Sequence, residues 1–183
     1  MGGIAMKYKG PLIVVKEMER SRKFYEELLG QKVMFDFGAN IAFESGLSLQ
    51  TRDSWSGFLG DSEDTVVFRS NNFELYFEEK NFDQFLEKLN RWDGVEPIHD
   101  MREYSWGQRA VRFYDPDKHI VEVGESMVKV IQRFRDQGMT AAEIAERSQH
   151  PLEFVNGVLK EKYQKKLVGV KCSVLKAPGN DDF

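Results

Sequence analysis

Apolar and polar residues alternate regularly over residues 108–114 and again over 119–124. This period of two is typical of half-buried β-strands. The intervening Asp115-Pro116-Asp117 favours a tight turn, because Pro presets φ and Asp side chains bond nearby backbone. The pattern therefore predicts a β-hairpin. Glu122 lies out of phase with the apolar positions of its strand, so it faces the other side of the sheet, where it needs a cation, a metal, a hydrogen-bond donor or water.

The beginning of the chain predicts a strand at 7–15 and then a helix from about Glu19 to Leu29. Apolar residues of this helix recur at a spacing of three to four, and Gly30 is a suitable C-terminal stop. Short strands are expected at 32–37, 40–44 and 47–52. The segment 53–64 is rich in Ser, Gly and Asp, which predicts a loop or lid.

The same order of elements then occurs again. A strand is predicted at 73–77 and a helix at 82–92, with Phe82, Phe85, Leu86 and Leu89 on one face. Further strands are expected at 97–101, 108–114 and 119–124. The sequence thus predicts a strand, a helix and three strands, twice, which is an α+β fold.

Two stretches resemble the vicinal oxygen chelate superfamily, which includes glyoxalase I, bleomycin-resistance proteins and extradiol dioxygenases. One is the hairpin at 106–124, although Lys118 stands where the family usually has Gly. The other is 15–30, with Ser21, Phe24-Tyr25 and Leu29-Gly30 in the family's spacing. The resemblance covers roughly 7–125. It implies paired βαβββ modules that form an eight-stranded cup, and a homodimer.

The resemblance also implies four metal-ligand positions on the cup strands. They fall at Gly10, at Gln50 (or Ser48 if the register shifts by two), at Glu74 and at Glu122. Gly10 has no side chain, so the first ligand is missing. Family enzymes hold a divalent metal, here Mn, Ni, Zn, Fe or Mg. Two carboxylates and an amide suit Mg²⁺, Ca²⁺ or Mn²⁺ better than zinc. The sequence also allows a site that holds no metal.

Glu74 and Glu122 have two further interpretations. Carboxylates that share a cup repel each other unless a cation lies between them, and Arg52, Arg109 or Arg112 is a candidate for that cation. The resulting network is either structural or binds a polar ligand. Alternatively, the two acids have a metal-free acid/base role. In a metal-assisted enzyme, Glu122 would be a metal ligand and Glu74 a ligand or base.

Aromatic and cationic residues gather in the segments expected to line the cup, and small-molecule sites are mostly apolar with a few polar groups. The predicted substrate-binding residues are Arg52, Trp55, Tyr76, Trp106 and Arg109. Arginine suits an anionic or carbonyl-bearing ligand. The alternative is that individual aromatics belong to the core or to a dimer interface.

The character of the sequence changes after Glu125. We expect a main domain at 1–125, a helical appendage at 126–166 and a partly disordered tail at 167–183. In the appendage, a helix ends at Gly138, a capping box at Thr140 opens a second helix, and Pro151 starts a third that runs to about Tyr163. The last two helices resemble a helix-turn-helix, with Gln149 where its turn usually has Gly.

Charge and composition restrict the function classes. Residues 1–125 hold 16 basic and 23 acidic side chains, and 126–183 hold 10 and 7. An acidic main domain disfavours nucleic acid as a partner, and the recognition face of the appendage lacks basic residues. No transmembrane run or secretory signal is expected, and the single cysteine, Cys172, favours a cytoplasmic protein.

Three functions fit the sequence. The first is a glyoxalase/bleomycin-resistance-like protein that binds or transforms a small molecule, with a degenerate or absent metal site. If it is an enzyme, the resemblance implies a lyase, isomerase or dioxygenase. The second is a non-catalytic protein that binds a drug or metabolite. The third is a ligand-sensing regulator that uses the C-terminal helices.

Overall fold

The computed structural model describes residues 5–60 and 66–160, and they form two compact units. Of these residues, the first unit contains 5–60, 66–102 and 109–124. The second contains 103–108 and 125–160. The division at Gly124 lies beside the boundary expected at residue 125. The segment 103–108, expected in the main domain, belongs with the helices instead.

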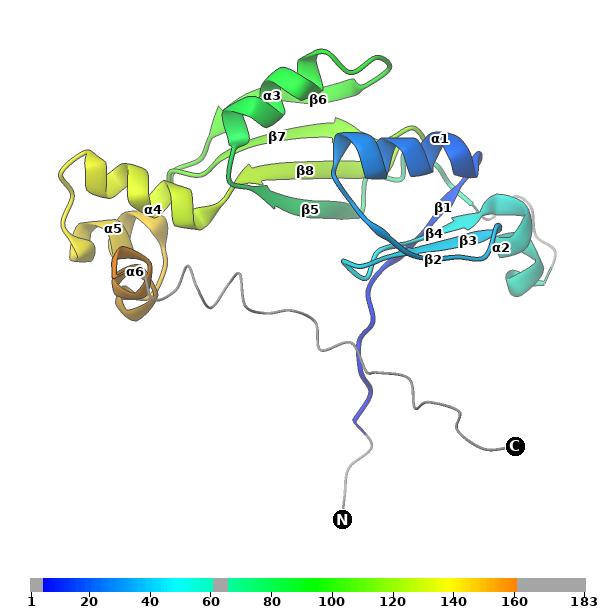
Figure 1. Ribbon diagram of the computed structural model, residues 1–183, viewed down its shortest axis with the longest axis horizontal. Helices are drawn as coiled ribbons and strands as arrows, with labels where there is room; N and C mark the ends of the chain where they lie inside the picture. Colours follow the sequence, from blue (N-terminus) through cyan, green and yellow to red (C-terminus); the bar gives the residue numbers. More distant parts are fainter. Residues whose placement is uncertain (1–4, 61–65, 161–183) are drawn as a thin grey trace, which may run out of the picture. The chain divides into compact units, whose positions relative to one another are not determined.

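The first unit runs strand, helix and three strands, twice (Figure 1). Its first module contains β1 (Leu12–Val15), α1 (Met18–Lys23) continued by a π-helical turn η1 (Phe24–Leu28), β2 (Val33–Asp36), β3 (Asn40–Phe43) and β4 (Ser48–Thr51). Its second module contains β5 (Glu74–Glu79), α3 (Phe82–Asn90), β6 (Glu96–Glu103), β7 (Arg109–Tyr114) and β8 (Ile120–Glu125). The order of elements predicted from the sequence is confirmed.

Each module forms a four-stranded mixed sheet. The strand orders are β1-β4-β3-β2 and β5-β8-β7-β6, so the two modules repeat one topology. In the first sheet β1 pairs in parallel with β4, while β3 pairs antiparallel with β2 and with β4. In the second, β7 and β8 form the predicted antiparallel hairpin, in which Arg112 is opposite Glu122. The α+β fold of paired βαβββ modules is thus confirmed, with its eight strands divided between two sheets.

Alternation along the strands decides which face of each sheet is buried. Val111 and Phe113 of β7 and Val121 and Val123 of β8 are at most 5% exposed and belong to one apolar core. Helices α1 and α3 lie on the same side of the second sheet in Figure 1, and their apolar residues, such as Phe24 and Phe85, belong to the same core. The opposite face carries the out-of-phase residues. We call this second face the cup face.

Helix α1 is joined to the β7–β8 turn by buried polar contacts. The Tyr25 hydroxyl donates to Asp115 Oδ2 at 2.8 Å, and the Ser21 hydroxyl donates to Asp117 Oδ2 at 3.0 Å. Arg20 reaches Asp117 Oδ1 at 2.9 Å, and the His119 ring lies 2.9 Å from Asp115 Oδ2. Asp115 and Asp117 are at most 1% exposed. The two sequence stretches that carry the family resemblance therefore contact each other directly.

The segment 53–64 differs from the predicted loop. Helix α2 (Arg52–Leu59) occupies its first part and ends at Gly60, whose φ of 75° gives a left-handed cap. Ser and Gly are poor helix formers, which is why composition favoured a loop. A specific side-chain contact opposes that preference, because the Gln50 amide of β4 donates to the Ser54 hydroxyl at 2.6 Å. Residues 61–65 lie outside the described residues.

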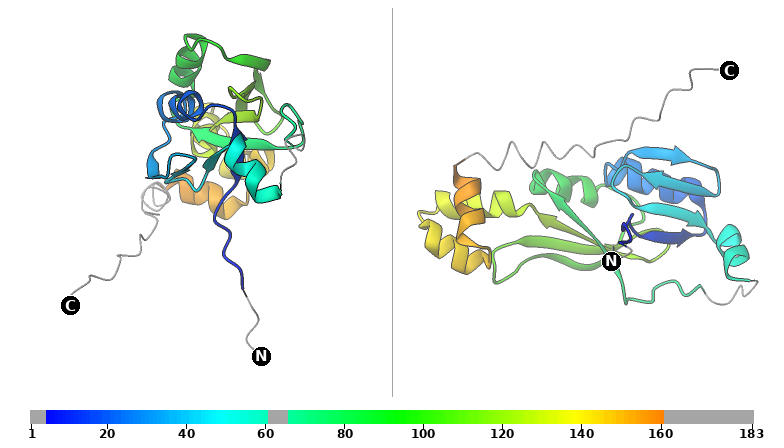
Figure 2. Two further views of the ribbon diagram at one scale, coloured as in Figure 1. Left: turned by 90° about the vertical axis from the view of Figure 1, so that its right-hand side faces the viewer. Right: turned by 90° about the horizontal axis from the view of Figure 1, so that it is seen from below.

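The second unit is built on three helices, α4 (Met127–Asp136), α5 (Ala141–Ser148) and α6 (Leu152–Leu159), which pack together in Figure 2. Their core includes Phe134, which is fully buried. Gly107 belongs to this unit and lies against the Phe134 ring, because an added Cβ would be 2.0 Å from Phe134 Cζ. Gln108 also belongs to this unit, and its amide donates to the backbone oxygen of Glu125, just before α4, at 3.0 Å.

The predicted capping box is confirmed, since Thr140 and Glu143 bond each other's backbone N–H. Gln149 ends α5 in the left-handed conformation with φ of 57°, at the position where a helix-turn-helix usually has Gly. Helix α6 ends at Leu159, earlier than predicted. The expected tail and Cys172 lie outside the described residues. Within the described ranges, no helix has the length and apolar character needed to cross a membrane.

Candidate functional site

Three charged side chains of the second sheet meet on the cup face. Arg112 of β7 donates from Nε to Glu74 Oε2 of β5 at 3.0 Å. Its NH2 group forms an ion pair with Glu122 Oε2 on β8. The strand order β5-β8-β7 explains the arrangement, because Glu122 lies on the strand between the other two. The two acids that the sequence singled out are thus brought together, with a guanidinium bridging them.

Burial differs among the three. The Glu122 side chain is 8% exposed, the Arg112 side chain 26% and the Glu74 side chain 42%. A buried carboxylate needs a counter-charge, and Arg112 supplies it for Glu122. Arginine suits this position because its planar fork donates to two carboxylates at once. Of the three cations considered from sequence, Arg112 is the one observed between the acids.

The first predicted ligand position is closed by the backbone. Gly10 has φ of 130°, and a Cβ built there would lie 2.0 Å from the carbonyl oxygen of Gly46. Gly46 in turn has φ of 92°, and a Cβ built there would lie 2.7 Å from the Lys9 carbonyl oxygen. Any side chain at position 10 therefore requires the two backbones to separate. A fourth ligand from this strand position is sterically excluded in the observed conformation.

Gln50, the second predicted ligand, lies on β4 and is 4% exposed. Its side-chain oxygen accepts from Asn40 at 2.9 Å, and its nitrogen donates to Ser54 at 2.6 Å. Sequence reasoning did not identify Asn40 and Ser54, because neither belongs to a recognisable motif. The amide is thus held within the first module, whereas Glu74 and Glu122 are held by Arg112 in the second.

This donor set does not fit a divalent metal. Among the described residues, no three His, Cys, Asp or Glu side chains are grouped so that they could hold an ion. The two carboxylates already share a guanidinium, whose positive charge occupies the position that a cation would need. The remaining predicted ligand positions are Gln50, whose amide lies in the first sheet, and Gly10, which has no side chain. We therefore derive no step through a metal.

Two of the predicted substrate-binding residues, Arg109 and Trp106, contact other parts of the chain. Arg109 is in phase with the core residues of β7; it pairs with Asp83 of α3 at 2.7 Å and lies over the Phe82 ring. It is on the helix side of the sheet, not on the cup face. Trp106 packs against the apolar core of the second unit and donates to Gln108 at 3.1 Å. Trp106 thus belongs with the helices of the second unit, and its role in substrate binding stays a prediction.

The other three predicted residues are placed differently. Tyr76 follows Glu74 on the cup face of β5, is 49% exposed, and donates to Glu78 at 3.0 Å. Arg52 and Trp55 lie on α2, in the segment that was expected to be a loop. Trp55 packs edge-on against Phe58. The cup face of β5 thus offers an exposed phenol beside the bridged acids.

One strongly shifted ionisable group lies away from the cup face. Burial, followed by the nearby charge of Asp115 and the hydrogen bond to it, raises the pKa of the Tyr25 hydroxyl well above its usual value near 10. Tyr25 therefore stays protonated and acts as a hydrogen-bond donor to a buried acid. Its role is to join α1 to the hairpin rather than to exchange protons.

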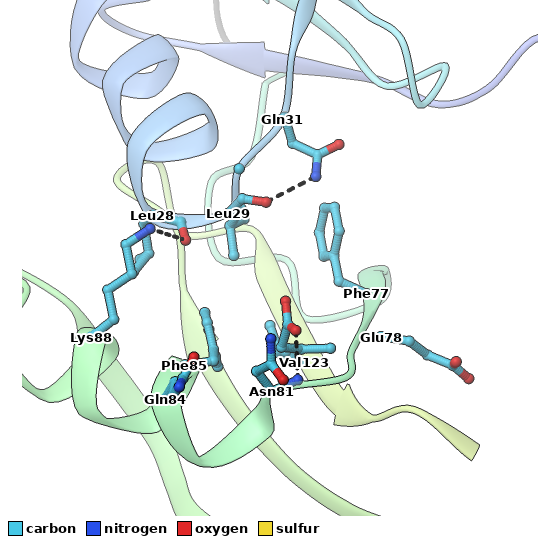
Figure 3. A pocket seen from close by; sticks show the side chains of 12 residues that line it. Leu28, Leu29, Gln31, Phe77, Glu78, Asn81, Gln84, Phe85, Lys88 and Val123 are labelled. Atoms are coloured by element: carbon cyan, nitrogen blue, oxygen red, sulfur yellow. Dashed lines mark hydrogen bonds between the residues drawn. The ribbon is translucent and has the colours of Figure 1, made fainter. Parts of the chain in front are cut away.

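A pocket of about 270 Å³ lies on the helix side, between the end of η1, the end of β5 and the start of α3 (Figure 3). Leu28, Phe77, Phe85 and Val123 form its apolar part. Two of its polar side chains bond backbone: Lys88 donates to the carbonyl oxygens of Glu27 and Leu28, and Gln31 donates to that of Leu29, as dashed for Leu28 and Leu29 in Figure 3. The Lys88 contacts satisfy carbonyl groups at the C-terminal end of η1.

Comparison with known proteins agrees with this architecture. The family model described as a glyoxalase-like domain matches residues 8–128. The chain belongs to the glyoxalase-like family. A search of the curated proteins finds no match.

Solved structures extend the comparison. A protein of unknown function from Agrobacterium tumefaciens is 34% identical over 68% of this chain and 97% of its own, with a TM-score of 0.60. A glyoxalase-related enzyme from Fulvimarina pelagi is 19% identical over 68% and 91%, with a TM-score of 0.57. A glyoxalase/bleomycin resistance protein/dioxygenase family enzyme from Burkholderia phytofirmans is 11% identical over 64% and 96%, with a TM-score of 0.56. The last two likenesses show the fold alone.

Proposed function

We propose that this glyoxalase-like protein binds a small polar molecule on the cup face without a metal. The observation that carries the proposal is the guanidinium of Arg112 between Glu74 and Glu122. In this arrangement the arginine provides the positive charge that a metal would otherwise supply. It also fixes both carboxylates as hydrogen-bond acceptors.

The chemistry of the face favours a ligand with hydroxyl or amino groups. Glu74, Glu78 and Glu122 outnumber the single arginine that bridges two of them, so the local charge is negative. Glu74 is partly exposed and retains lone pairs for a donor from the ligand. The exposed ring of Tyr76 adds an apolar surface for the body of the ligand.

A catalytic role is the second candidate, with Glu74 as the acid or base. Its partial exposure makes it the accessible carboxylate of the pair, whereas Glu122 is nearly buried. Binding without turnover is favoured because Glu74 already accepts a hydrogen bond from Arg112. A lyase, isomerase or dioxygenase reaction of the metal-assisted kind finds no suitable donor set on this face.

The test is a thermal-shift screen of the full chain against small hydroxylated and amino compounds, followed by mass spectrometry of each compound that binds. We expect at least one compound to raise the melting temperature and to remain chemically unchanged. The shift should be lost in Glu74→Gln and kept in Glu87→Gln, a matched exposed acid on α3. Equal shifts in both variants would refute the cup face as the site, and turnover of the compound would favour the enzyme.

We further propose a cytoplasmic homodimer that uses the edge of the first sheet. Strand β2 is an edge strand, and Met34 on it and Phe37 just after it are 43% and 70% exposed. Phe35 stacks on Phe37 with ring centroids 6.0 Å apart, which forms an exposed apolar row. Nucleic acid is not proposed as a partner, because α6 contains no lysine or arginine to contact phosphates.

A further inference from the structure

A groove of about 740 Å³ lies on the first unit away from the cup face. It is lined by α1 and η1, by the residues that follow α3, and by the β7–β8 turn. This volume is within the range of small-molecule sites, roughly 300–1,000 Å³. We call it the Trp92 groove, after the aromatic residue in its wall.

The charge of the Trp92 groove is opposite to that of the chain. Its lining contains four cationic residues, Arg20, Lys23, Arg91 and Lys118, against the acids Glu27 and Asp93, whereas the protein as a whole has a formal net charge of −4. Acids outside the lining pair with three of these cations: Asp117 with Arg20, Glu87 with Arg91 and Glu96 with Lys118. A concave surface that gathers exposed cationic side chains attracts anions.

Two of these cations are available for a ligand. Lys23 is exposed, and no ion pair joins it to another described residue. Arg91 approaches Glu87 only at 3.5 Å, with the two side chains 80% and 68% exposed. By contrast, Arg20 is held by the buried Asp117. The groove therefore combines a fixed cation with mobile donors.

The backbone at Lys118 is a second, independent observation. This residue has φ of 70°, in the left-handed region that favours glycine. A side chain there costs about 1–2 kcal/mol relative to the right-handed conformation, and glycine would avoid this cost. The residue in this strained conformation has a long cationic side chain, which lies in the lining of the groove and whose ammonium pairs with Glu96 at 2.7 Å.

Apolar surface completes the site. Trp92, Val95 and Pro116 line the groove beside the charged residues. Apolar surface of this kind favours the ring or hydrocarbon part of a ligand, and a tryptophan face also accepts stacked rings. We infer that the Trp92 groove is a second binding site, and that its ligand is a small organic anion, a phosphate or a carboxylate that carries an apolar ring.

The experiment is calorimetric titration of the full chain with phenyl phosphate and with benzoate. Phenol, which has the ring without the charge, and inorganic phosphate, which has the charge without the ring, are the controls. We expect saturable binding of at least one ring-bearing anion, about tenfold tighter than either control, because charge and ring each contribute. Absence of saturation, or equal affinity for phenol or inorganic phosphate, would overturn the inference.

Variants locate the site. Lys23→Gln combined with Arg91→Gln should weaken binding about tenfold, since two charge-assisted contacts are lost. The control, Lys32→Gln combined with Lys129→Gln, removes two exposed lysines outside the groove and should change affinity less than about twofold. Equal weakening in both pairs would mean that only the net charge matters, which would refute the site.

Lys118→Gly separates binding from folding. The substitution relieves the left-handed strain, so the melting temperature should be kept or raised, while the loss of a groove cation should lower affinity about threefold. Unchanged affinity in a folded Lys118→Gly variant would remove this residue from the site and contradict the argument from strain. None of these variants alters Glu74, Arg112 or Glu122, so the outcome is independent of the cup face.

Discussion

Replacement of Arg112 by Met tests the bridge between the two acids. Methionine keeps much of the apolar stem but removes the charge, which leaves Glu122, 6% exposed, without its counter-ion. Breaking a fully buried ion pair costs about 3–5 kcal/mol. Arg112 is itself about a quarter exposed and Glu74 is exposed further, so solvent screening reduces the expected loss to about 2 kcal/mol.

The measurement is the free energy of unfolding from urea denaturation. Arg109→Met is the matched control, because Arg109 is on the same strand and 21% exposed, but its partner Asp83 is 76% exposed. An ion pair with an exposed partner contributes about 1 kcal/mol or less. We therefore expect the control to lose about half as much as Arg112→Met, or less.

A double-mutant cycle separates the bridge from simple loss of packing. With Glu122→Gln already present, Arg112→Met no longer strands a charge and should cost about 1 kcal/mol less than in the wild type. If Arg112→Met and Arg109→Met lose the same stability, or the cycle shows no coupling, the bridge does not hold the buried acid as we argue.

Three further outcomes are expected. Tyr25→Phe removes the donor to Asp115 and should lower the unfolding free energy by about 1–3 kcal/mol. Because the pKa of Tyr25 is raised in the folded state, the contribution of this hydroxyl to stability is full below pH 10 and is lost above it. The stability deficit of the variant should therefore shrink in urea titrations at higher pH, and a constant deficit would contradict this. Gly10→Ala pushes a methyl group into Gly46 and should cost at least about 2 kcal/mol by the same method; a neutral change would show that the position is not closed. Gln149→Gly relieves the left-handed turn between α5 and α6 and should raise the melting temperature by about 1–2 °C, whereas a lower one would show that the turn is not strained.

The order of strands and helices was predictable because the apolar periods of two and of three to four are local signals. The hairpin at 108–124 and the helix carrying Phe24 and Tyr25 occur where the pattern indicated. Helix α2 was missed, because its Ser and Gly content favours a loop, whereas a specific hydrogen bond from Gln50 to Ser54 accompanies the helix. Local composition does not report such a contact.

The site was predicted less completely. The family resemblance pointed to Glu74 and Glu122, and alternation along the strands indicated that they share one face of the sheet. Arg109 was expected to line the cup, although alternation puts it in phase with Val111; its pairing with Asp83 depends on where α3 lies. Trp106 was expected beside the cup, whereas residues 103–108 belong with the helical unit, and no local pattern marks that change.

Calorimetric titration of the full chain with Mn²⁺, Ni²⁺, Zn²⁺ and Fe²⁺ most directly tests the claim that Arg112 occupies the place of a metal. We predict no saturable binding in the micromolar range, because the two carboxylates already share the guanidinium and Gly10 contributes no ligand. One-to-one binding at micromolar concentration that is lost in Glu122→Gln would contradict the account.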